Sequence, residues 1–182
     1  AYPDMLEVGY MANVTEDRSH FGAWVIVSSP LTLSFDLTNT TLLDRVWPII
    51  SNRALLKVNA AWAGSPGRRL KITPSYQVWT KPLANDEHAL FVLASGASPV
   101  QVTVDLAQLG PTAAQDAGAV VTAVRDLYDG RLITARVSGL LLITDVIAAH
   151  DSRFYSVRIS HGSARSSPAL MQGARATPPP LP

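Results

Sequence analysis

Few side chains of this sequence could carry out chemistry, and their spacing excludes several kinds of site. The 182 residues include 14 acidic side chains, four histidines and no cysteine. The lack of cysteine excludes a thiolate nucleophile, a thiolate zinc site and a disulfide framework. His88, His150 and His161 lack the spacing of metal ligands, so we expect neither a metal nor a cofactor. His20 precedes an apolar helical stripe and is predicted to be a helix-surface or capping residue.

The acidic residues near the start of the chain allow two interpretations. By pattern alone, Asp4 after Pro3 is typical of a solvated turn, and Met5 is typical of a core. Asp36 follows a short apolar run and could cap the next loop or approach a site from its rim; we favour the cap. The stretch Gly64–Gly67 lacks the lysine and the strand-to-helix setting of a phosphate loop, so it is predicted to be a linker.

Two asparagines lie in sequons for N-glycosylation. Asn13-Val14-Thr15 and Asn39-Thr40-Thr41 both fall in predicted loops. If the chain passes through a secretory pathway, Asn13 and Asn39 are candidate glycan acceptors.

The composition excludes some classes of partner. A formal net charge of +1 with 16% charged residues offers little attraction for nucleic acid. Mean hydropathy is +0.15. The longest apolar stretch, Leu140–Ala149, is interrupted by Asp145 and falls short of the ~18 residues of a membrane span. The first residues lack the basic start and apolar stretch of a signal peptide.

The first 60 residues predict strands alternating with helices. Met5–Gly9 and Leu31–Phe35 are short apolar runs typical of strands. A helix is expected to begin with Thr15 as its cap and to end before Pro30, and a second helix is expected over Leu42–Ile50, shortened or kinked by Pro48. This order indicates parallel strands with crossover helices.

Two parallel strands with two helices cannot bury both faces of a sheet, so this part is predicted to belong to a larger α/β domain. Trp24 and Trp47 lie at helical positions and are predicted to be core residues. Trp62 and Trp79 are predicted to pack between this part and the part that follows.

The pattern changes near Gly64–Gly67 to short β-rich runs. Asp129-Gly130, between two of these runs, predicts a tight hairpin. From His161 onward Ser, Ala, Arg and Pro dominate, which indicates a linker or a wrapping segment. The seven runs predict an antiparallel sandwich; they are Tyr76–Thr80, Ala89–Ala94, Val100–Leu106, Val120–Leu127, Arg131–Val137, Leu140–Val146 and Phe154–Ile159.

An ordered series of motifs resembles the last third of α-galactosidases of glycoside hydrolase family 27, over roughly residues 2–159. Each motif is short, and their order carries the resemblance. They are Tyr2–Gly9, Arg18–Trp24, Ser29-Pro30-Leu31, Asp36-Leu37, Val58-Asn59, Gly67-Arg68-Arg69, Val78–Leu83 and Val124–Tyr128.

The resemblance implies a (β/α)8 barrel followed by an antiparallel β domain. Residues 3–9 would be barrel strand seven, 16–29 its helix, 30–35 strand eight and 41–52 the last helix. We therefore expect an α/β plus all-β fold in three parts. They are the last two β/α units of a barrel (1–66), an antiparallel β-sandwich (67–160) and a Pro/Ala/Ser-rich tail (161–182).

The resemblance also implies where the chemistry lies. Members of the family retain anomeric configuration with a nucleophile and an acid/base carboxylate. Both lie on strands four and six, upstream of Pro3-Asp4-Met5, so no catalytic residue is expected in this chain. Asp4 and Met5 match residues that line the sugar pocket. The chain departs from the family at Ala1-Tyr2, where Asn-Asp is usual, and at Ala60, where Gln is usual.

Three hypotheses follow. The first is the C-terminal part of an α-galactosidase-like retaining glycoside hydrolase, completed by a polypeptide that carries strands one to six and acting on a terminal α-galactoside. That polypeptide would be a separate chain or upstream sequence, and the protein would be secreted, lysosomal or vacuolar. The second is an inactive structural or carbohydrate-binding subunit of a larger complex. The third is a free sandwich module with a disordered α/β stub.

Overall fold

The computed structural model describes residues 4–109 and 118–160. The predicted tail, 161–182, lies outside these residues, as do Pro3 and His161. In the part of the chain that is described, no helix is long and apolar enough to span a membrane.

Each of the three helices in the described residues begins directly after an asparagine. These helices are α1 (Val14–Ile26), α2 (Thr40–Ile50) and α3 (Arg53–Ala60). The Oδ1 atoms of Asn13, Asn39 and Asn52 accept hydrogen bonds from backbone N–H groups of the first turns, which lack partners within the helix. The cap of α1 is therefore Asn13 and not Thr15. The helix expected over Leu42–Ile50 is confirmed as α2, which contains Pro48. The end expected at residue 52 is too late, because the chain breaks at Ser51–Asn52 and Asn52 starts another helix.

The two predicted parallel strands shrink to a single bridge. Leu6 pairs with Leu33 in parallel, and the Leu6 N–H donates to the carbonyl of Thr32 at 2.8 Å. After Glu7 the chain turns, with Gly9 at a φ of +97° that favours glycine. The expected strands over 5–9 and 31–35 are thus too long. A parallel pair without neighbours on its outer edges has little to extend it.

Eight strands of the described residues form two antiparallel sheets, and the hairpin turn at Asp129-Gly130 is confirmed by a hydrogen bond from the Gly130 N–H to the Asp126 carbonyl. The five-stranded sheet has the order β1 (Arg68–Ile72), β2 (Tyr76–Pro82), β3 (Glu87–Ala94), β8 (Ser152–Ser160) and β5 (Val120–Asp126). The three-stranded sheet has the order β4 (Thr103–Asp105), β7 (Leu141–Ile143) and β6 (Val137–Ser138), and a short 3-10 helix, η1 (Leu106–Leu109), follows β4.

The predicted antiparallel β-sandwich is confirmed in outline, with two differences. The sequence did not predict β1, because its composition, Arg-Arg-Leu-Lys-Ile, is mostly charged. The strand expected over Arg131–Val137 is reduced to β6, since residues 131–133 contact β5 only through the Arg125–Leu132 bridge and its neighbouring hydrogen bonds.

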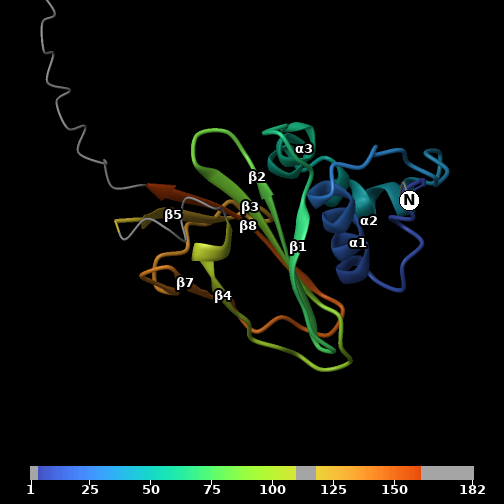
Figure 1. Ribbon diagram of the computed structural model, residues 1–182. Coiled ribbons are helices and arrows are strands. Elements are labelled where there is room, and N and C mark those ends of the chain that lie inside the picture. Colours follow the sequence, from blue (N-terminus) through green and yellow to red (C-terminus); the bar gives the residue numbers. More distant parts are fainter. Residues whose placement is uncertain (1–3, 110–117, 161–182) are drawn as a thin grey trace, which may run out of the picture.

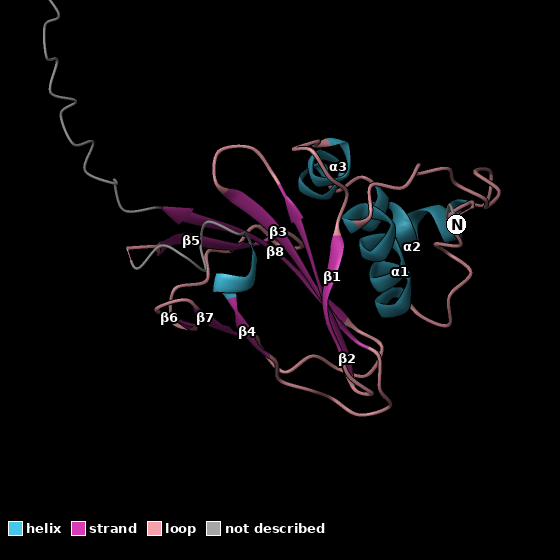
Figure 2. Ribbon diagram, viewed as in Figure 1, coloured by secondary structure: helices cyan, strands magenta, loops and turns pink. Residues whose placement is uncertain are grey.

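The five-stranded sheet lies between the helices on one side and the small sheet on the other (Figures 1 and 2). Leu90 and Val92 of β3 belong to the core beneath the small sheet, whereas Ala89 and Phe91 belong to the core beneath the helices. Successive strand residues point to opposite faces, so one strand serves both cores. All four side chains are 0% exposed.

The stretch Gly64–Gly67 joins the helices to the sheets and is fixed at one end. The Gly67 N–H donates to the carbonyl of Ile26, the last residue of α1, at 3.0 Å. A Cβ on Gly67 would lie 2.1 Å from that carbonyl oxygen, so only glycine fits this approach.

Two of the four tryptophans are more exposed than predicted. Trp24 is half-buried and packs on the helix-side core, as does Trp79. Trp47, predicted to be a core residue, is 57% exposed. Trp62 is 67% exposed and does not pack between the two parts. The helical spacing of Trp47 indicated an apolar face correctly but could not say whether this chain covers it.

Candidate functional site

The candidate pocket residues lie at the start of the described chain, directly before the parallel bridge. Asp4 is exposed and Met5 is 45% exposed, while the next residue, Leu6, is fully buried. The interpretation of Met5 as a core residue is therefore not supported in this chain. We refer to residues 4–7 as the Asp4–Glu7 segment.

The Asp4–Glu7 segment is held mainly through its backbone. The indole Nε1 of Trp24 donates to the Asp4 carbonyl at 3.4 Å, and the Glu7 N–H donates to Nε2 of His20 at 3.0 Å. The hydroxyl of Ser34 donates to the Leu6 carbonyl. Because the fixing contacts are made by the main chain, the side chains of Asp4 and Met5 are left to face their surroundings.

His20 is more than the surface residue that the sequence predicted. It is half-buried, and its ring stacks against Trp24 with the ring centroids 4.1 Å apart. Burial lowers the pKa of His20 below its usual 6.5, and the nearby carboxylates of Glu7 and Asp17 oppose that shift. An Nε2 atom that accepts a hydrogen bond carries no proton, so the geometry and the pKa direction both favour neutral imidazole.

A buried ion pair fixes the turn that follows the segment. Asp17 of α1 is 0% exposed, and its Oδ1 accepts the Gly9 N–H at 2.5 Å. Its Oδ2 pairs with Arg45 of α2 at 2.5 Å, and Arg45 also donates to the Met11 carbonyl. Asp17 was not singled out from the sequence. The available signal was its spacing, since Asp17 lies one turn before the buried Phe21 on the same helix face.

The residues just before His20 connect α1 to the sandwich. Arg18 pairs with Asp151 at 2.6 Å and lies over the ring of Tyr128, with its guanidinium carbon 4.8 Å from the ring centroid. The hydroxyl of Ser19 lies 3.0 Å from that of Ser152, which is also 2.7 Å from the Tyr128 hydroxyl. Burial raises the pKa of Tyr128 above its usual value, so it stays protonated. One short motif thus joins the sandwich to the Asp4–Glu7 segment.

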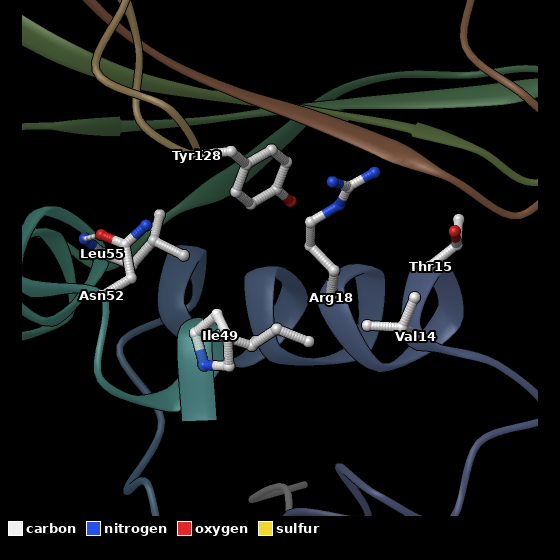
Figure 3. A pocket seen from close by; sticks show the side chains of 8 residues that line it. Val14, Thr15, Arg18, Ile49, Asn52, Leu55 and Tyr128 are labelled. Atoms are coloured by element: carbon white, nitrogen blue, oxygen red, sulfur yellow. Dashed lines mark hydrogen bonds between the residues drawn. The ribbon is translucent and has the colours of Figure 1, made fainter. Parts of the chain in front are cut away.

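A cavity of about 210 Å³ lies along this junction (Figure 3). Arg18 reaches from α1 toward the strands, and Tyr128 extends from the sandwich side to meet it. Asn52 caps α3 and also donates to the Leu127 carbonyl at 2.9 Å. The lining holds no acidic residue, so it offers no carboxylate for acid or base catalysis. It consists of Val14, Thr15, Arg18, Pro48, Ile49, Asn52, Leu55 and Tyr128.

A second cavity, of about 390 Å³, lies between the paired segments and helices α2 and α3. Most of its lining is apolar, and it includes the exposed Trp47 and Leu56. We call it the apolar cavity. Its lining consists of Leu6, Phe21, Leu31, Leu33, Trp47, Ile50, Ser51, Arg53 and Leu56.

The other predicted site residues are exposed. Asp36 accepts hydrogen bonds from the N–H and hydroxyl of Thr38, and these bonds lower the pKa of Asp36. The favoured interpretation of Asp36 as a loop cap is therefore confirmed. Asn13 and Asn39 are exposed helix caps, of α1 and α2 respectively. Among the described residues, no group of three or more His, Cys, Asp or Glu side chains could hold a metal ion.

Comparisons with known sequences give a consistent answer. A domain family described as "Alpha galactosidase C-terminal beta sandwich domain" matches residues 73–157. An α-galactosidase of Coffea arabica is 31% identical over 153 residues, which are 84% of this chain and 38% of that protein. An α-galactosidase of Cyamopsis tetragonoloba is 33% identical over 109 residues, 59% of this chain and 26% of that protein.

Solved structures agree. The crystal structure of α-galactosidase I from Mortierella vinacea matches with a TM-score of 0.72 and 27% identity, covering 85% of this chain and 38% of that chain. A GH27 β-L-arabinopyranosidase from Geobacillus stearothermophilus matches with a TM-score of 0.70 at 19% identity, over 94% of this chain and 38% of that one. The second likeness shows the fold alone.

The chain spans between 26% and 38% of the lengths of these relatives. The matched sandwich family, the sequence relatives and the structural neighbours all lead to one assignment. The chain belongs to glycoside hydrolase family 27 and matches the C-terminal part of α-galactosidases of that family.

Proposed function

We propose that this chain is the C-terminal part of a retaining α-galactosidase, in which Asp4 and Met5 line the sugar pocket and both catalytic carboxylates lie on polypeptide outside residues 1–182. The observation that carries the proposal is the parallel bridge between Leu6 and Leu33, directly after the two candidate pocket residues. In this proposal the segments around Leu6 and Leu33 are barrel strands seven and eight.

The position of the bridge supports a pocket role for Asp4 and Met5. In (β/α)8 barrels the active site lies at the C-terminal ends of the strands. Leu6 is the last paired residue before the chain turns toward α1. A strand that arrives from upstream would therefore have Asp4 and Met5 near its C-terminal end. Strand seven then ends at Leu6 and does not continue to residue 9.

The face that Met5 occupies also supports the proposal. Successive side chains of an extended chain alternate in direction, and Leu6 points into the helix-side core. Met5 would then face the opposite side, which is the interior of a completed barrel. Its 45% exposure is consistent with a neighbour that this chain does not contain.

The apolar cavity supports packing against a polypeptide that carries strands one to six. That polypeptide would be upstream sequence or a separate chain. Its lining exposes Trp47 and Leu56 beside the half-buried Leu31 and Leu33. Apolar patches of this kind mark surfaces that pack against another element. In the proposed enzyme, strand one and the first helix of the barrel would pack there.

We further propose a secreted, lysosomal or vacuolar protein that carries glycan at Asn39 more readily than at Asn13. Both side chains are exposed. A glycan is attached to Nδ2. Nδ2 of Asn13 donates to the Glu16 carboxylate at 3.1 Å. Asn39 caps α2 through its Oδ1. Glycopeptide mass spectrometry of the secreted protein tests this order of occupancy.

The decisive experiment measures the α-galactosidase activity of the assembly and identifies the polypeptides in it. The assembly containing this chain is purified, every polypeptide in it is identified by intact mass, and it is assayed on p-nitrophenyl α-galactoside, with NMR of the released sugar. We expect hydrolysis with α-galactose as the first product, and a loss of at least about tenfold in kcat/KM for Asp4→Asn. Asp44→Asn, at an exposed position on α2, is the matched control and should be unchanged.

Two outcomes would contradict the proposal. An assembly that contains strands one to six but hydrolyses no α-galactoside favours the inactive structural or carbohydrate-binding subunit. A chain that sediments as a monomer, with residues 1–60 sensitive to protease, favours the free sandwich module.

A further inference from the structure

The Asp4–Glu7 segment is fixed by two side chains of α1 that lie one turn apart. Trp24 donates to the Asp4 carbonyl, and His20 accepts the Glu7 N–H. The two rings pack against each other with their centroids 4.1 Å apart and their planes tilted by 42°. Asp4 is therefore one anchoring point and Glu7 the other, with Met5 and Leu6 between them, and the contact between the two rings links the anchors.

The helix that carries these anchors is itself fixed to the sandwich. Arg18 and Ser19, which directly precede His20, contact Asp151 and Ser152 at the start of β8. Ser19 and Ser152 are buried, as is Asp151. Since side chains in a short run of a rigid helix cannot move independently of its backbone, the sandwich sets the position of His20. The series of contacts runs from β8 through α1 to the Asp4–Glu7 segment.

We propose that His20 is a positioning residue for the sugar pocket, and that its unprotonated Nε2 holds the Glu7 end of the Asp4–Glu7 segment in place and releases that end in acid. The proposal rests on the function proposed above for Asp4 and Met5. Protonation of Nε2 would place two donors, the imidazolium N–H and the Glu7 N–H, opposite each other, and the hydrogen bond would be lost.

The charges around His20 set the direction of this response. The carboxylates of Glu7 and Asp17 favour the imidazolium, but Asp17 is already paired with Arg45, and burial has the larger effect. The pKa in the folded chain lies below 6.5, so the unfolded chain binds the proton more tightly. The stabilising contribution is therefore complete above about pH 6.5 and is lost as the pH falls through the lower, folded pKa.

Two substitutions separate the hydrogen bond from the ring stack. In His20→Gln the side-chain carbonyl can accept the Glu7 N–H and does not titrate. In His20→Phe the ring can still stack on Trp24, but no acceptor remains. Amide hydrogen exchange of the full 182-residue chain is followed by NMR over a pH series from neutral to about 4.5. The Leu6 N–H, bonded to Thr32, serves as the internal control.

We expect the wild-type Glu7 N–H to be protected at neutral pH and to lose about tenfold in protection, beyond the intrinsic pH effect, as His20 titrates. His20→Gln should keep the protection across the series, His20→Phe should lack it throughout, and the Leu6 N–H should stay protected in all three. Equal Glu7 protection in the three proteins, or an acid-insensitive wild type, would overturn the proposal.

Kinetics of the active assembly test the link to the pocket. His20→Phe should raise KM about fivefold at neutral pH with kcat changed by less than about twofold, because the pocket wall is displaced and the carboxylates are not. His20→Gln should keep the wild-type KM at neutral pH and remove its rise in acid. An inactive assembly with the expected exchange pattern rejects the proposed function and keeps the anchoring role. An active one with three equal exchange patterns rejects the anchoring role alone.

Discussion

The two faces of the five-stranded sheet meet different surroundings. On one face, Leu90 and Val92 pack beneath the small sheet, in a core that this chain completes by itself. On the other face, Phe91 packs beneath the helices, in a core whose outer layer still exposes Trp47. The same strand therefore borders a finished core and an unfinished one. We infer from this difference that the sandwich core holds together by itself and that the helical layer depends on what packs around it.

The most severe test of this comparison truncates neighbouring residues of β3. Phe91→Ala should lower the stability of the helical layer by about 4 kcal/mol, and Leu90→Ala should lower that of the sandwich by about 3 kcal/mol. We expect the effects to be asymmetric, because the helices need the sheet but the sandwich has its own core. Native-state hydrogen exchange measures both parts, with Val25 reporting on α1 and Leu142 on β7.

In Phe91→Ala, Val25 should lose protection while Leu142 keeps most of it. In Leu90→Ala, both should lose protection. If Phe91→Ala exposes Leu142 as strongly as Val25, the two faces form one cooperative unit, and the comparison fails.

The next test concerns the ion pair inside the helical layer. Asp17→Ala removes a carboxylate that is 0% exposed and leaves Arg45 and the Gly9 N–H without it. Loss of one partner of a buried pair costs about 3 kcal/mol. Urea unfolding followed by tryptophan fluorescence measures the free energy of unfolding. Glu16→Ala, at the adjacent half-buried position, is the control and should cost less than about 1 kcal/mol. Equal losses would mean that Asp17 acts only as a first-turn acid.

A third test addresses the cation that joins the helical layer to the sheet. Lys81 of β2 is 0% exposed, and its ammonium donates to the carbonyls of Val58 and Asn59 at the end of α3. Lys81→Met should cost about 2 kcal/mol, because two carbonyls lose their donor. Lys57→Met, at an exposed position on α3, should have little effect and is the matched control. Far-ultraviolet circular dichroism during urea unfolding measures the loss.

The pH dependence of the free energy of unfolding gives a second test of Lys81. Burial lowers the pKa of Lys81 from its usual 10.5. The unfolded chain then binds the proton more tightly than the folded chain, so stability due to Lys81 rises as the pH increases toward 10.5. This rise should be absent in Lys81→Met. A wild type and a variant with parallel pH profiles would contradict the direction of the pKa shift.

The sequence predicted the finished core better than the unfinished one. The short apolar runs of β3 and β8 and the Asp129-Gly130 turn depend on local rules and on neighbours within the chain, so the antiparallel sandwich was predictable. β1 was missed because its charged residues contact solvent at a sheet edge and leave no apolar pattern.

The helical layer was harder to predict because its determinants are distant in sequence. The partner of Asp17 is Arg45, and the partner of His20 is the backbone of Glu7, and no local pattern records either contact. Trp47 has the spacing of a core residue but no cover among the described residues. Asp4 and Met5 are proposed as pocket residues by resemblance alone, since a pocket residue needs no periodicity. The burial of Asp17 was missed as well, although its spacing to Phe21 places it on the apolar face.

The smallest expected effects come from one substitution made at two helix caps. Asn39→Asp keeps the cap of α2, since aspartate is as good an N-cap as asparagine, and should change the free energy of unfolding by less than about 0.5 kcal/mol. Asn52→Asp also keeps its cap but loses the Nδ2 donor to the Leu127 carbonyl, which joins the helical layer to the sandwich side, and should cost about 1 kcal/mol. Urea unfolding of the two proteins, both made without glycan, measures the difference. Identical stabilities would mean that this hydrogen bond adds nothing to the attachment of the helices. Apolar contacts such as those of Phe91 would then hold the helical layer on the sheet.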